Sequence, residues 1–86
     1  MAELLFSPEA DESLSALERD PKFATLVGKI HAALDLLEAD PGDVRCRRHR
    51  YQNVGVWGMV VSAEGEQRQI YWEPVEEELV HVHAIT

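Results

Sequence analysis

Val54-Gly-Val-Trp-Gly-Met-Val-Val-Ser62 is an apolar run, rich in β-branched and aromatic residues, that decides the fold class of this chain. Its composition and length are typical of a strand. The next four residues, Ala63-Glu-Gly-Glu66, indicate a hairpin turn in which Gly65 can supply a positive φ. Gln67–Trp72 is then the returning strand, ending near Pro74, and a polar turn at 76–78 leads to a last strand over Leu79–Ile85. The second half of the chain is therefore predicted to be a three-stranded antiparallel meander.

The first half of the chain carries helical patterns instead. Glu3–Phe6 suits a brief strand, and Ser7-Pro8-Glu9 then has the capping residue, the proline and the acidic residue of a helix start. Asp20-Pro21 repeats the start signal, and Asp40-Pro41-Gly42 ends a second helix of about 19 residues. Apolar residues recur at helical spacing along this second helix: Phe23, Leu26, Val27, Ile30, Ala33, Leu34 and Leu37.

These elements predict one α+β domain over residues 1–86, with a short N-terminal strand and two consecutive helices packed on one face of a C-terminal antiparallel sheet. With 45% hydrophobic and 28% charged residues, the composition is that of a globular domain. No apolar run approaches the ~20 residues of a membrane span, and no signal segment opens the chain. The single cysteine, Cys46, excludes an internal disulfide. We therefore expect a cytoplasmic protein that does not bind a membrane.

Positive charge is concentrated in one stretch, Val44–Tyr51, called the basic segment below. The chain has a net charge of −8, yet four of its eight Lys and Arg residues lie in this segment: Arg45, Arg47, Arg48 and Arg50. Arginines beside an aromatic residue, here Tyr51, are a usual surface for phosphate and bases. Two other interpretations stay open: the arginines bind an acidic partner, or they pair with the chain's own acids.

The conformation of the basic segment decides which of its side chains lie together. If it is a strand, Arg45, Arg47, His49 and Tyr51 share one face. The flanking arginines would lower the pKa of the Cys46 thiol and make it more reactive.

His81 and His83 alternate along the last strand and therefore share a face, opposite Val80, Val82 and Ala84. The apolar face should meet the helices, so the histidines should line the open face of the sheet that contains Arg68. An imidazole pKa close to neutrality suits proton transfer. Two histidines at this spacing can also share a metal, but no further Cys or His completes a cluster, so no metal site is predicted.

Three strand segments give a resemblance to a known family. They are Val56-Trp-Gly-Met-Val-Val61, Gln67-Arg-Gln-Ile-Tyr-Trp72 and Leu79-Val-His-Val-His-Ala-Ile85. In this order they resemble the C-terminal half of the RelE/ParE toxin superfamily, where a "vWelRv" strand precedes a "yRviY" strand and an apolar final strand. The helical half, with its Asp-Pro near the end of the second helix, is similar too.

The resemblance implies a toxin of a toxin–antitoxin pair, with an antitoxin protein as its partner. The RelE-like branch cuts mRNA on the ribosome without a metal or other cofactor, and the ParE-like branch poisons DNA gyrase. By position it implies that Arg45, Arg47, Arg48 and Arg50 bind substrate. Arg68, matching the arginine of "yRviY", would stabilise transition-state charge, and His49, His81 or His83 would move protons.

The chain also departs from the nuclease pattern at two places. The arginine of "vWelRv" falls at Val60, and the last strand stops at Thr86, where relatives often continue into a catalytic residue. Two hypotheses follow. The first is a metal-independent mRNA endonuclease of the RelE type, and the second is a catalytically silent member that binds an antitoxin, gyrase or a second copy of itself.

Overall fold

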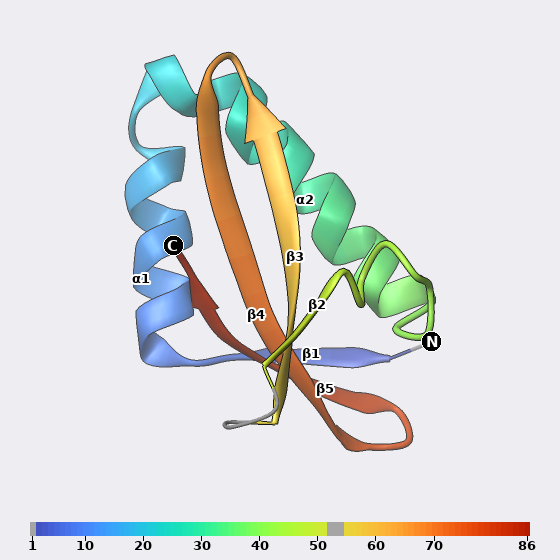
Figure 1. Cartoon of the computed structure of the whole chain (residues 1–86). Helices are drawn as coiled ribbons and strands as arrows, with labels where there is room; N and C mark the ends of the chain where they lie inside the picture. The colour runs from blue at the N-terminus through green and yellow to red at the C-terminus, as the bar shows by residue number, and fades with distance from the viewer. Residues whose placement is uncertain (1, 52–54) are drawn as a thin grey trace.

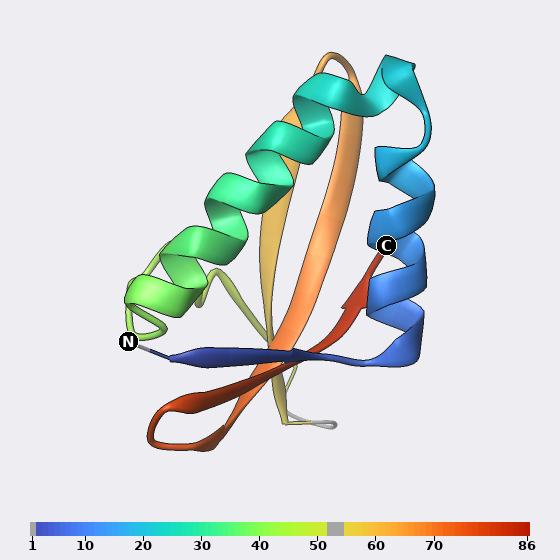
Figure 2. The same cartoon turned by 180° about the vertical axis from the view of Figure 1, so that it is seen from behind.

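A computed structural model describes residues 2–51 and 55–86. Its elements follow the order β1 (Glu3–Phe6), α1 (Pro8–Glu18), a 3₁₀ turn (Pro21–Phe23), α2 (Ala24–Ala39), β2 (His49–Tyr51), β3 (Val56–Ala63), β4 (Glu66–Glu76) and β5 (Leu79–Ile85). The predicted α+β class is confirmed, with both helices on one face of the sheet (Figures 1 and 2). Val54, the predicted start of the strand run, lies outside the described residues.

The helix boundaries match the sequence signals. The Ser7 side chain caps α1 by accepting a hydrogen bond from the Ala10 amide at 3.0 Å, and Pro8 is the first helical residue. Asp20 caps the segment that follows by accepting from the Lys22 amide at 3.1 Å. This segment opens as a 3₁₀ turn before α2 begins at Ala24, so the predicted second helix is an α-helix with a tighter first turn.

The sheet contains five strands in the order β1-β5-β4-β3-β2. β1 pairs parallel with β5, while the other three pairings are antiparallel. The expected meander is therefore present as β3, β4 and β5, and it is extended by one short strand on each edge. The sheet is mixed because of its edge strand β1. This strand precedes both helices in the chain, whereas the other four strands follow them (Figure 1).

The β3–β4 hairpin turns as expected, with φ of 53° at Glu64 and 83° at Gly65. Two successive positive φ values make the turn whose twist matches that of the strands, and glycine adopts the second at no steric cost. The predicted end of β4 near Pro74 is wrong, because β4 continues to Glu76. A register shift between Pro74 and Glu76 accommodates the proline within the paired strand.

A bulge interrupts the pairing of β4 with β5. Tyr71 pairs with Ala84 and Trp72 with Val82, so His83 is an extra residue in β5. Its carbonyl accepts a hydrogen bond from the Ser7 hydroxyl, which ties the start of α1 to the bulge. The bulge also corrects one expectation: Ile85 is buried, whereas Ala84, predicted to face the helices, is only half-buried.

The core fills the space between the helices and the sheet. Trp72 and Ile70 of β4 are fully buried and belong to the same cluster as the α2 residues Leu26, Ile30 and Leu37. One cluster gathers residues from β3, β4, β5 and both helices. Among the described helices, none is long and apolar enough to cross a membrane.

Candidate functional site

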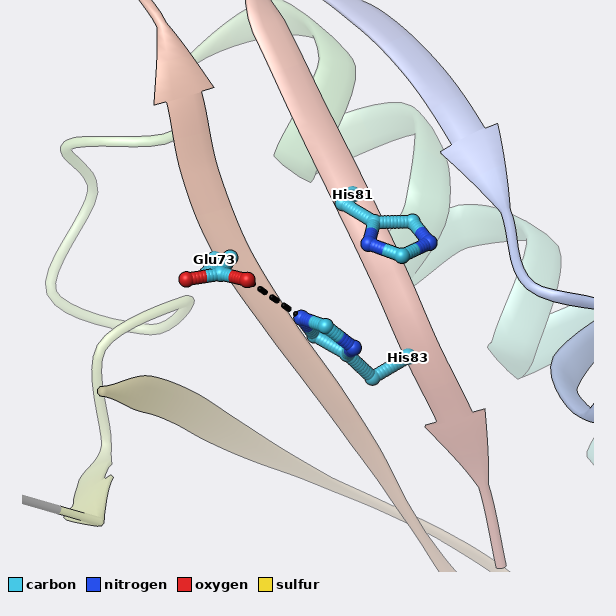
Figure 3. A group of neighbouring side chains, drawn as sticks. All are labelled: Glu73, His81 and His83. Atoms are coloured by element: carbon cyan, nitrogen blue, oxygen red, sulfur yellow. Dashed lines mark hydrogen bonds and ion pairs between the residues drawn. The ribbon is translucent and has the colours of Figure 1, made fainter. Parts of the chain in front are cut away.

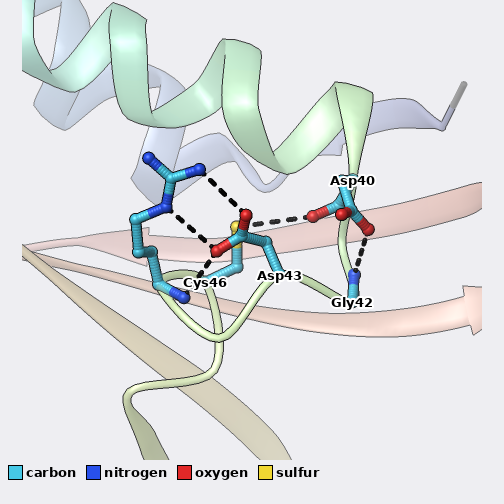
Figure 4. Close-up of polar contacts among 5 residues, drawn as sticks. Asp40, Gly42, Asp43 and Cys46 are labelled. Carbon is cyan, nitrogen blue, oxygen red and sulfur yellow. Dashed lines mark hydrogen bonds and ion pairs between the residues drawn. The ribbon is translucent and has the colours of Figure 1, made fainter.

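The basic segment is mostly a loop. Turns run through residues 41–48, and only His49–Tyr51 forms a strand. Asp43 directs the loop: its carboxylate accepts from the Arg45 amide at 2.8 Å and from the Arg45 guanidinium at 3.0 and 2.9 Å (Figure 4). The condition for a common face of Arg45, Arg47, His49 and Tyr51, a strand, is therefore met only over His49–Tyr51, because a turn-forming Asp overrides strand pairing at the two arginines.

Cys46 anchors this loop to the core. Its side chain is fully buried, and its carbonyl accepts a hydrogen bond from the Trp72 indole at 2.8 Å. Burial raises the pKa of the Cys46 thiol to about 11, with smaller contributions from Asp43 and Asp40. The expectation of a lowered pKa is therefore wrong, because removal from water outweighs the attraction of the neighbouring arginines.

Two arginines of the basic segment pack on tryptophan. The guanidinium carbons of Arg47 and Arg50 lie 5.0 and 4.7 Å from the ring centre of Trp57, which stacks on Trp72 at 6.4 Å. Arg47 also donates to the Pro41 carbonyl at 3.0 Å, and Arg50 to the Gly55 carbonyl at 3.2 Å. Both side chains thus have structural contacts that hold the loop against the sheet.

A shallow groove lies where the C-terminal half of α2 passes the outer edge of β3. Its lining has an apolar part and a basic part: Ala32, Ala33, Leu36, Met59 and Val60, with Arg45, Arg48 and His49. Among the described residues, β2 pairs with β3 over Val56–Gly58, so β2 leaves the edge of β3 uncovered from Met59 onward. We call this feature the β3-edge groove.

The charges at the β3-edge groove are not equivalent. Hydrogen bonds from Arg45 lower the pKa of the Asp43 carboxyl to about 2, so this carboxylate stays ionised and offsets the charge of Arg45. Arg48 has no hydrogen bond or ion pair to any other described residue. Val60 is 37% exposed. Arg48 is therefore the cation of the groove most available to a ligand.

Tyr51 lies on the open face of the sheet, with His49 beside it. Its hydroxyl donates to the Gln69 side chain at 2.9 Å, and its ring meets Tyr71 edge-on at 5.4 Å. Burial raises the pKa of the Tyr51 hydroxyl, and Tyr71 adds to the effect. A Cβ at Gly58 would come within 2.9 Å of the Tyr51 ring, so this glycine makes room for it. Tyr51 is thus a packed residue of the β2–β3 pair.

His81 and His83 lie on the open face of the sheet, as predicted. Their ring centres are 4.2 Å apart, and His83 Nε2 lies 2.7 Å from a carboxylate oxygen of Glu73 (Figure 3). Sequence reasoning missed Glu73. The signal was the strand register, since Glu73 stands directly opposite His81, but a bulge and a proline made that register unreadable from spacing alone.

Arg68 lies apart from both groups. It donates to Glu66 at 3.0 Å, and its guanidinium carbon is 5.6 Å from the ring centre of Phe23, which packs against the core. Its side chain is therefore on the helix side of the sheet, opposite His81 and His83. Of the residues implied as catalytic, the structure brings only His49 to the arginines of the basic segment.

The fold defines a class, a five-stranded α+β domain with its helices on one sheet face. Comparisons with known proteins add no particular relative: no protein-family description, no curated protein and no solved structure matches the chain.

Proposed function

We propose that this chain is a cytoplasmic RelE/ParE-like toxin that acts by binding, and that the β3-edge groove holds an acidic, amphipathic segment of its antitoxin. The observation that carries the proposal is the composition of the groove. Its apolar floor includes Leu36 and Val60, and Arg45, Arg48 and His49 supply the basic part. A segment with apolar residues on one side and carboxylates on the other matches both parts.

The edge of β3 offers a second kind of contact. A strand edge without a neighbour presents backbone donors and acceptors that an extended peptide can pair with. β2 ends its pairing at Gly58, and the groove begins beside Met59. A partner segment that continues the line of β2 would extend the sheet and place its side chains alternately on the floor and toward Arg48.

Electrostatics favours a protein partner over nucleic acid. The chain has a net charge of −8, which repels a polyanion at long range. In the groove, Asp43 offsets Arg45, and Val60 stands where nuclease relatives have an arginine. A short acidic peptide requires only the local charge of Arg48, whereas an RNA strand requires several phosphate contacts.

A metal-independent mRNA endonuclease is the second candidate. The observation in its favour is that the groove gathers His49 with Arg45 and Arg48, a proton-transfer group beside two cations. Arg68 and the pair His81 and His83 lie elsewhere on the sheet, on opposite faces. In this candidate His49 alone would move protons at the groove, without Arg68 to stabilise the developing charge.

Inducible expression in a bacterial host separates the two candidates. We expect growth arrest with cellular mRNA intact by primer extension. Co-expression of an acidic antitoxin reading frame, to be sought beside the gene, should relieve the arrest. Codon-specific mRNA cleavage would contradict the binding account and support the nuclease. Growth without arrest would contradict both, and arrest with gyrase-linked DNA breaks would assign the toxin to the ParE-like branch.

A further inference from the structure

Glu73, His81 and His83 form a compact cluster of metal-ligating side chains outside the β3-edge groove. Each offers one ligand atom, and these atoms all lie within 4.8 Å of one another. The three side chains come from the neighbouring strands β4 and β5 and gather on the open face of the sheet (Figure 3). Their types, two imidazoles and one carboxylate, are a common ligand set for Zn²⁺.

The backbone explains why these three residues meet. Glu73 and His81 are direct cross-strand partners, so their side chains leave the same face at close range. His83 belongs to the bulge of β5 and also lies on that face, next to His81. The Ser7 hydroxyl holds the bulge carbonyl, which fixes the position of His83 from the helix side. The cluster is therefore built on paired strands and does not depend on a loop.

The charge balance of the cluster favours a cation. Among the described residues, Glu73 has a hydrogen-bond contact with His83, and no Lys or Arg is paired with it. The side chains of His83 and Glu73 are 34% and 36% exposed, so the carboxylate is partly removed from water. A divalent ion would offset this charge, and the net charge of −8 attracts cations to the molecule.

We infer that Glu73, His81 and His83 bind a divalent transition metal of the Zn²⁺ class, with water as a further ligand. Ligand atoms about 2.0–2.1 Å from a tetrahedral metal lie about 3.3 Å apart. The 2.7 Å contact between Glu73 and His83 would open slightly, and the wider separations, up to 4.8 Å, would close by side-chain rotation. Mg²⁺ and Ca²⁺ prefer oxygen ligands, so two imidazoles select against them.

Three ligands leave at least one coordination position for solvent. This arrangement is that of zinc sites which bind water or a ligand, whereas purely structural sites have four protein ligands. The cluster involves β4 and β5, and the β3-edge groove involves α2, β2 and β3, so metal binding and partner binding are separate properties. An experiment that disproves metal binding therefore does not disprove partner binding at the groove, and the reverse also holds.

Calorimetric titration of the untagged protein with ZnCl₂, and with MgCl₂ as the comparison metal, tests the inference. We expect one Zn²⁺ per chain and no saturable Mg²⁺ binding. His81→Gln and Glu73→Gln should each weaken Zn²⁺ binding by at least about tenfold, because even residues outside the first ligand sphere typically contribute about 10- to 100-fold. His31→Gln is the matched control, because His31 pairs with Glu18 on the helices, away from the cluster.

The Co²⁺-substituted protein gives a second readout that does not depend on affinity. Intense visible absorption bands of a tetrahedral Co²⁺ ion should appear in the native chain and in His31→Gln, and should be lost in His81→Gln. Circular dichroism of the metal-free variants checks that they remain folded. Absence of saturable Zn²⁺ binding, or binding unchanged in His81→Gln and Glu73→Gln, would overturn the inference. Binding lost only in His31→Gln would place the metal at Glu18 and His31 and would overturn it equally.

Discussion

Chemically similar residues of the basic segment have different neighbours, and these neighbours set their roles. Arg47 packs on Trp57 and donates to the Pro41 carbonyl, whereas Arg48, the next residue, lines the β3-edge groove. Cys46, one position earlier, is fully buried and carries a raised pKa. Three consecutive residues of the loop are therefore an inert thiol, a packed cation and an available cation.

The buried thiol of Cys46 leads to a prediction at the residue scale. Its pKa is about 11 in the folded state against 9.0 as the ordinary value, so the folded state binds the proton more tightly. This contribution to stability is fully present below pH 9 and is lost as the pH rises through about 11. We therefore expect the free energy of unfolding to fall between pH 9 and pH 11, and less so in Cys46→Ala.

Thiol labelling measures the same property directly. At pH 8, iodoacetamide should modify the native chain far more slowly than the chain unfolded in urea, because the reactive species is the thiolate. Rapid labelling of the native chain would contradict the buried position of Cys46.

At the scale of elements, Ser7 connects three parts of the fold. Its hydroxyl accepts a hydrogen bond from the Ala10 amide at the start of α1 and donates a hydrogen bond to the His83 carbonyl in the bulge. Its amide donates to the Val82 carbonyl at 2.9 Å. The end of β1, the start of α1 and the bulge of β5 thus meet at one buried polar residue. The position of the bulge, and with it that of His83, depends on this contact.

Replacement of Ser7 by alanine should lower the free energy of unfolding by more than the loss of a helix cap alone would. Loss of the cap costs about 1 kcal/mol, and an unsatisfied carbonyl at the bulge costs about 1–3 kcal/mol more. We expect Ser7→Ala to lower the free energy of unfolding by about 2–4 kcal/mol in urea denaturation. Ser13→Ala in the same helix is the control and should change it by no more than about 0.5 kcal/mol. A loss confined to about 1 kcal/mol would show that Ser7 acts only as a cap.

Across the whole molecule, the sequence predicted the regular elements better than their assembly. The caps at Ser7 and Asp20, the stripe of α2 and the turn at Gly65 follow from local rules, and the structure confirms them. The bulge at His83 has no local signal, because it depends on how β5 pairs with β4.

The candidate sites likewise depend on contacts between residues that are far apart in the sequence. Glu73 enters the histidine cluster only through the strand register, and Val60 and Leu36 meet only when α2 packs beside β3. The pKa of Cys46 was mispredicted because sequence neighbours suggested charge, while tertiary packing imposed burial. Spacing along the chain could locate the basic segment but could not show which of its arginines are available.

The affinity of the chain for an acidic, amphipathic peptide, the proposed antitoxin segment, tests the central claim most directly. We would measure it by calorimetry for the native chain, for Arg48→Glu, and for Arg19→Glu, which makes the same charge change at the residue directly after α1. The account predicts a stable complex that Arg48→Glu weakens by about tenfold or more and Arg19→Glu leaves nearly unchanged. No complex, or equal weakening by both variants, would contradict binding at the β3-edge groove.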